Sequence, residues 1–114
     1  MPITIRLMHH DEETAQVIIA GGTLGPEAAA RLRRSLASAA EDHRRLVVDL
    51  SQIREITSDA LGALAEAAAE LRWKGGDLAV VALGAIAEHI EGAGFAQALN
   101  LAKDASTACK LIGS

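Results

Sequence analysis

Two hydroxyl groups and a carboxylate stand side by side at Thr57, Ser58 and Asp59. A hydroxyl at the start of a helix lies beside backbone N–H groups that have no partner within the helix, and these groups favour a phosphate. Phosphorylation of Ser58 would add about −1.5 to −2 charges at one point of the surface. The run therefore predicts a switch with Ser58 as acceptor and Thr57 as the less favoured one.

The flanking segments predict the elements that position Ser58. Residues 46–48 form an apolar run that ends in Asp49, which is typical of a strand covered on both faces. After Asp59, apolar residues recur at spacings of three and four, as in an amphipathic helix: Leu61, Leu64, Ala68 and Leu71. A simpler role for Ser58 is thus that of helix N-cap, with Asp59 complementing the helix dipole.

Residues 49–83, DLSQIREITSDALGALAEAAAELRWKGGDLAVVAL, resemble the central signature of the STAS domain, named for sulphate transporters and anti-sigma factor antagonists. In that family a strand ending in Asp-Leu-Ser leads through an apolar loop to Asp-Ser-Ser/Thr-Gly-Leu-Gly, then to a helix, Gly-Gly and another strand. The resemblance spans nearly the whole chain and implies a single STAS-like domain over residues 1–114. It also implies that Ser58 is the phosphorylated serine and that Leu61 and Gly62 are the Leu-Gly pair.

The sequence departs from the family pattern at four positions. Thr57 replaces an Asp, Asp59 replaces a Ser or Thr, and Ala60 replaces a Gly. Upstream, Gly25 occupies the Asp position of the family's Gly-x-Leu-Asp. In the helix that follows, Glu66 and Glu70 form an acidic edge with Asp59. From the resemblance and from this edge, we expect the partner-binding residues to be Gly25, Thr57, Ser58, Asp59, Ala60, Leu61, Gly62 and Glu66.

Two functions follow from the resemblance. In the first, the chain is an anti-sigma factor antagonist in a partner-switching circuit, where it binds an anti-sigma factor that is also a serine protein kinase. The kinase would inactivate the antagonist by phosphorylating Ser58, and a serine phosphatase would restore the active form by removing the phosphate. In the second, the chain is a non-phosphorylated STAS subunit or regulator of a membrane lipid-transport ATPase complex, which the residues at Thr57 and Ala60 favour.

Composition bounds the remaining possibilities. The 114 residues fit one domain, and a net charge of −4 with a pI near 5.5 argues against non-specific nucleic-acid binding. The single Cys109 excludes an internal disulfide and fits a reducing compartment, and we expect it to be a small buried hydrophobe. No apolar run approaches the roughly 20 residues that cross a bilayer, and the first residues lack a signal-peptide core, so we expect a cytoplasmic protein without membrane insertion.

No motif for catalysis, a cofactor or a metal is present. The chain lacks a phosphate-binding loop, a nucleophile elbow and a metal-spaced group of His and Cys. His9 and His10 are expected in a polar loop, where adjacent side chains point apart. The sequence therefore predicts a binding module without cofactor, and not an enzyme.

The fold class predicted from the whole pattern is α/β, a mixed sheet with helices packed on it in the order ββαβαβαβα. Residues 3–8 predict an edge strand, paired antiparallel with residues 15–20, and Pro26 begins a helix that runs to about Glu41. A later strand spans residues 77–83, and a short one lies near 95–101. Between them we expect a helix that contains Ile86, and after them a terminal helix over residues 106–112. Trp73, at the end of its helix, is expected to cover the core.

Overall fold

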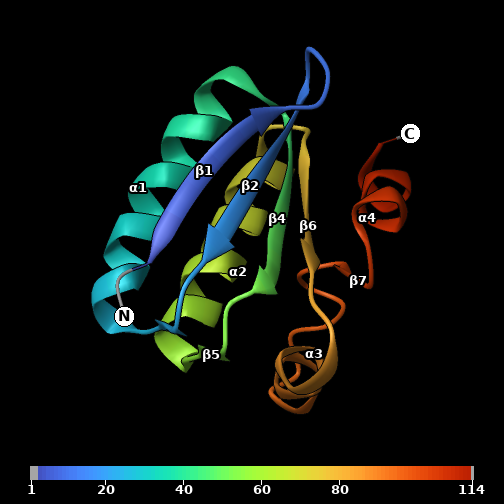
Figure 1. The fold of residues 1–114 in the computed structure, drawn as a ribbon. Helices are drawn as coiled ribbons and strands as arrows, with labels where there is room; N and C mark the ends of the chain where they lie inside the picture. The colour runs from blue at the N-terminus through green and yellow to red at the C-terminus, as the bar shows by residue number, and fades with distance from the viewer. Residues whose placement is uncertain (1–2, 114) are drawn as a thin grey trace.

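A mixed five-stranded sheet forms the centre of the molecule, as the computed structural model of residues 3–113 shows (Figure 1). The strand order is β1-β2-β4-β6-β7. The first two strands form an antiparallel hairpin, and every other neighbouring pair in this sheet is parallel. The strand bounds are β1 (Thr4–His9), β2 (Thr14–Ala20), β4 (Arg45–Gln52), β6 (Asp77–Val81) and β7 (Leu101–Ala102).

Four helices complete the domain, and they cover the sheet unequally. Their bounds are α1 (Pro26–Asp42), α2 (Ser58–Trp73), α3 (Gly84–Gly92) and α4 (Ala105–Ile112). The apolar faces of α1 and α2 share the main core with one face of the sheet, and α3 adds Ile86 and Ile90 to that core. On the other face, Ala108 and Ile112 of α4 pack on Val47 and Val81. The predicted order ββαβαβαβα is therefore confirmed for the main sheet and the helices.

The central strand β4 is covered on both faces, as its sequence predicts. Leu46 and Val48 belong to the core beneath α1 and α2, whereas Val47 belongs to the core beneath α4. Side chains of successive strand residues point to opposite faces, so an uninterrupted apolar run suits a strand with helices on both sides. At its carboxyl end, β4 leads towards the start of α2.

Two further strands, β3 (Thr23–Leu24) and β5 (Glu55–Ile56), pair in parallel as a separate two-stranded sheet. The sequence did not predict them, because two residues are too few to show a strand period. Leu24 and Ile56 are buried in the main core, whereas Thr23 and Glu55 face solvent and share a hydrogen bond of 3.2 Å. This small sheet leads directly into α1 and α2.

Three expectations about the core and the strands were wrong. Trp73 does not cover the core, because its side chain is 90% exposed. It follows the buried Leu71 by two residues, about 200° further round the helix. The strand near 95–101 shrinks to Leu101–Ala102, because residues 96–100 form turns, and His9 belongs to β1 and not to a loop.

Candidate partner-binding site

Ser58 is the first residue of α2 and is exposed to solvent. The N-cap is Thr57, whose backbone is extended and whose carbonyl accepts a 3.0 Å hydrogen bond from the Leu61 N–H. The expectation that Ser58 is the N-cap was therefore wrong. The chain is extended at Thr57, which pairs with the small sheet, and the helix begins at Ser58, one residue earlier than a cap at Ser58 would place it.

The small sheet fixes Thr57 through two hydrogen bonds. Both the Thr57 N–H and the Thr57 hydroxyl donate to the Leu24 carbonyl, each at 3.1 Å. The Thr57 hydroxyl is thus engaged with the protein itself, whereas Ser58 lies outside this contact at the exposed start of the helix. The geometry therefore favours Ser58 over Thr57 as the residue that a modifying enzyme could reach.

The first turn of α2 leaves backbone donors open. Its N-cap makes no side-chain capping hydrogen bond, and the first N–H groups of a helix have no partner within the helix. Such donors, with the positive end of the helix dipole, favour negative charge. Asp59 supplies a carboxylate in this turn and is exposed. A phosphate on Ser58 would therefore find hydrogen-bond donors, but it would also stand next to one negative charge.

Gly25 lies beside Thr57, as the predicted site requires. A Cβ atom at Gly25 would lie 3.7 Å from the Thr23 methyl group and 3.9 Å from the Thr57 methyl group. Gly25 is also the N-cap of α1, so the starts of both long helices flank the small sheet. The structure thus brings Gly25, Thr57, Ser58 and Asp59 together at one end of the molecule.

The next three predicted residues contribute in different ways. Ala60 and Leu61 are 0% and 1% exposed, so their side chains hold α2 to the core. Gly62 is half-buried, and a Cβ atom there would meet nothing within 4 Å. Gly62 thus leaves open space one turn beyond Ser58, where a partner could approach the helix backbone.

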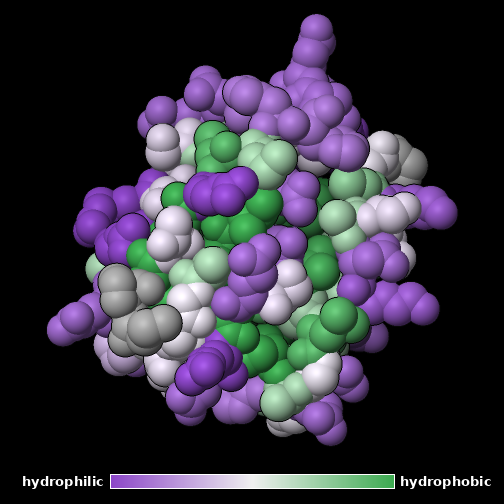
Figure 2. All heavy atoms as spheres, in the orientation of Figure 1, coloured by the Kyte–Doolittle hydropathy of each residue, from purple (hydrophilic) through white to green (hydrophobic). Residues whose placement is uncertain are grey.

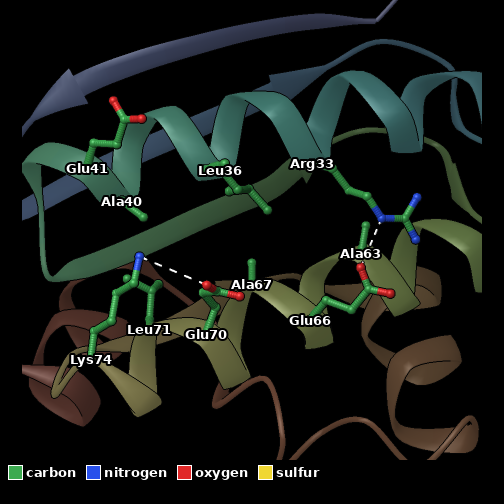
Figure 3. Close-up of a pocket in the computed structure, with 11 residues that line it drawn as sticks. Arg33, Leu36, Ala40, Glu41, Ala63, Glu66, Ala67, Glu70, Leu71 and Lys74 are labelled. Carbon is green, nitrogen blue, oxygen red and sulfur yellow. Dashed lines mark hydrogen bonds and ion pairs between the residues drawn. The ribbon is translucent and has the colours of Figure 1, made fainter.

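Glu66 lies two turns along α2, about 12 Å from Ser58 along the helix axis. Its carboxylate forms a 3.0 Å ion pair with Arg33 of α1, and both side chains are largely exposed. The pair crosses a groove of about 360 Å³ between the two helices (Figure 3). Glu66 is therefore oriented towards α1, and its predicted contact with a partner stays a prediction.

A pair of histidines was not predicted as a contact. His43 Nε2 lies 3.0 Å from His9 Nδ1, and His43 Nδ1 lies 3.1 Å from the Ala39 carbonyl. His43 is buried at the end of α1, so the pair joins that helix to the edge strand β1. The two residues are 34 positions apart, and no sequence signal joins them.

Asp49 of β4 interacts within its own strand, where its carboxylate accepts a 2.8 Å hydrogen bond from the Ser51 N–H.

Residues 3–113 contain no group of three or more His, Cys, Asp or Glu side chains that could hold a metal ion. Within the same residues, no helix has the length and apolarity that crossing a bilayer demands. Cys109 is half-buried against the α4 core, and burial raises the pKa of its thiol.

Comparisons with known proteins identify the family and the fold of the chain. A family model described as "Mlab, STAS domain" matches residues 8–103. No curated protein matches the sequence. Similar solved structures include an anti-sigma factor antagonist from Mycobacterium paratuberculosis, with 24% identity, a TM-score of 0.87 and coverage of 99% of this chain and 96% of that chain.

Two structures of the anti-sigma factor antagonist SpoIIAA are also similar. The unphosphorylated form has 14% identity and a TM-score of 0.78, with coverage of 95% of this chain and 96% of that chain. The phosphorylated form from Bacillus has 13% identity and a TM-score of 0.66, with coverage of 95% and 99%. At these identities the likeness establishes the fold. Because the family match extends over most of the sequence, the chain belongs to the STAS domain family.

Proposed function

We propose that this chain is a cytoplasmic anti-sigma factor antagonist, a single-domain binding protein and not an enzyme. Its partner would be an anti-sigma factor that is also a serine protein kinase, bound at the start of α2. The observation that carries the proposal is the exposed Ser58 at the first position of that helix, beside open backbone donors and directly after Thr57, which lies next to Gly25. Solved structures of the same fold include anti-sigma factor antagonists, which supports this class of partner.

Phosphorylation of Ser58 by the kinase would release the partner. The phosphate would add its charge beside Asp59, at the surface that the partner covers in the bound state. A complex formed by close contact at this turn would then lose complementarity through desolvation of the added charge and repulsion from acidic partner groups. A serine phosphatase would restore the binding form.

The direct test is to incubate the protein with ATP and a candidate kinase of the anti-sigma type, then to read the intact mass and map the site. We expect one phosphate, located on Ser58, and none on the Ser58→Ala variant. A phosphate that persists in the Ser58→Ala variant would refute the assignment of the acceptor.

The effect of charge on binding needs a matched control. Ser106 is also exposed in the first turn of a helix, α4, away from the site. We expect Ser58→Asp to weaken kinase binding at least tenfold in calorimetric titration and Ser106→Asp to leave it unchanged. Equal affinities of Ser58→Asp and the unchanged protein would refute the switch.

A second candidate function is a constitutive STAS subunit of a membrane lipid-transport ATPase complex. It is favoured by Thr57, which supplies no carboxylate before Ser58 and whose hydroxyl is bound to the Leu24 carbonyl. The matching family model also carries the name Mlab. In this case Ser58 would be a contact residue. A stable complex with the ATPase and no phosphate on Ser58 after incubation with kinase would favour this function over the first.

A further inference from the structure

The edge strand β1 has the features of a docking site that lies outside the surface proposed above. It pairs with β2 on one side only, so alternate backbone N–H and C=O groups point away from the sheet. Leu7 and Met8 on this strand are 52% and 44% exposed. Edge strands usually carry features that discourage pairing, and large exposed apolar residues do the opposite.

A hollow of about 310 Å³ lies between β1 and α1. Ile5 and Leu7 of β1 and Val17 of β2 supply its apolar side, and Ser35 and Ser38 of α1 supply small polar side chains opposite. Because side chains alternate along a strand, a chain added beside β1 would direct every second residue towards this hollow. The hollow would accept apolar side chains of moderate size.

Arginines lie on both faces of this edge: Arg34 lines the hollow, whereas Arg6, between Ile5 and Leu7 on β1, points to the opposite face of the sheet. Arg6 on β1 and Arg34 on α1 are exposed, and neither makes an ion pair with a carboxylate of residues 3–113. Nearby, the Arg31 guanidinium donates a 2.7 Å hydrogen bond to the Ile3 carbonyl beside β1. The whole chain has a net charge of −4, so this basic edge is a local exception. Figure 2 shows the sheet side of the molecule, where hydrophobic residues reach the surface between hydrophilic ones.

We propose that β1 binds an extended acidic segment of a partner protein, which adds a strand to the sheet. The backbone of that segment would bond to the free edge of β1, as in other cases of strand addition. Its apolar residues would enter the hollow, which Arg34 also lines, and the Asp or Glu residues that alternate with them would face Arg6 on the opposite face of the sheet. A second copy of this chain fits less well, because pairing of two β1 strands would bring both sets of arginines together.

The test uses two capped peptides, one of alternating valine and aspartate and one of alternating valine and lysine. Each is titrated into the isotope-labelled protein, and backbone amide shifts are followed by NMR. We expect the aspartate peptide to shift amides of residues 4–9 and 34–39, and to bind at least tenfold more tightly than the lysine peptide. Absence of shifts, shifts elsewhere, or equal affinity of the two peptides would overturn the proposal.

Matched variants separate this site from non-specific binding. Leu7→Asp should lower the affinity for the aspartate peptide at least tenfold, and Arg6→Glu should reverse the preference between the two peptides. Leu111→Asp is the control, because Leu111 is 50% exposed on α4, a helix that does not line the hollow. Equal effects of Leu7→Asp and Leu111→Asp would refute the site. A dimer in sedimentation that Leu7→Asp abolishes would replace the proposed partner with a second copy.

Discussion

The Leu24 carbonyl accepts two hydrogen bonds from Thr57, one from its N–H and one from its hydroxyl, each at 3.1 Å. This contact joins β3 to the residue that caps α2 and so sets where the helix begins. Ser58, the adjacent residue, is left exposed at a fixed position. The position of Ser58, the proposed phosphate acceptor, thus depends on the bond between Thr57 and Leu24, which lie 33 residues apart in the sequence.

Replacement of Thr57 by Val removes the hydroxyl and keeps the shape of the side chain. We expect the free energy of unfolding to fall by about 1 kcal/mol, the usual net value of one such hydrogen bond. Urea denaturation measures the change. Thr57→Ser is the control, since it retains the donor, and it should lose less stability than Thr57→Val. The reverse order would show that packing of the methyl group matters more than the hydrogen bond.

Replacement of Trp73 by Ala should change the free energy of unfolding by less than about 0.5 kcal/mol, because the indole is 90% exposed. Leu71→Ala, two residues earlier on the same helix, removes a buried side chain and should cost about 2 to 5 kcal/mol. As the only tryptophan, Trp73 also reports its own environment by fluorescence. Emission at the long wavelengths of a hydrated indole, with free access to acrylamide, is expected; a blue-shifted and protected signal would contradict the exposed position.

Sequence patterns predicted the elements with a clear period and failed where the outcome depends on distant contacts. The helix of α2 follows from the spacing of Leu61, Leu64 and Leu71, all of which are buried. By contrast, β3 and β5 have two residues each, and only their mutual pairing defines them. The N-cap was predicted at Ser58 and not at Thr57 for the same reason, because the extended backbone of Thr57 depends on its contact with Leu24 and not on the local sequence.

The site was predicted in the same uneven way. Family resemblance located Ser58 at the start of a helix, but it could not show that Ala60 and Leu61 face the core while Glu66 pairs with Arg33. Both facts depend on the angle of α2 against the sheet and α1. The hollow beside β1 was not predicted either, because it is formed by side chains of β1, β2 and α1 together.

His43 is a buried polar side chain whose two ring nitrogens both have partners, Ala39 O and His9 Nδ1. His43→Leu keeps a side chain of similar size but removes both hydrogen bonds. We expect it to lower the free energy of unfolding by about 1 to 3 kcal/mol. His10→Leu is the control, because His10 is exposed and should change stability by less than about 0.5 kcal/mol. Equal stability of His43→Leu and the unchanged protein in urea would show that the histidine pair contributes nothing.

Asp104 caps α4, and its carboxylate makes stability depend on pH. Its Oδ1 accepts a 2.7 Å hydrogen bond from the Thr107 N–H, which lowers the pKa of Asp104 below its usual value of 3.8. A carboxyl whose pKa is lower in the folded state stabilises the fold above the unfolded pKa, and this contribution is lost as the pH falls through the folded pKa. Asp104→Asn keeps an acceptor oxygen but not the charge, so its urea midpoint should lie below that of the unchanged protein at pH 7. The difference should disappear once the pH is below the folded pKa of Asp104. A difference that stays constant down to that pH would mean that the hydrogen bond alone, and not the charge, holds the start of α4.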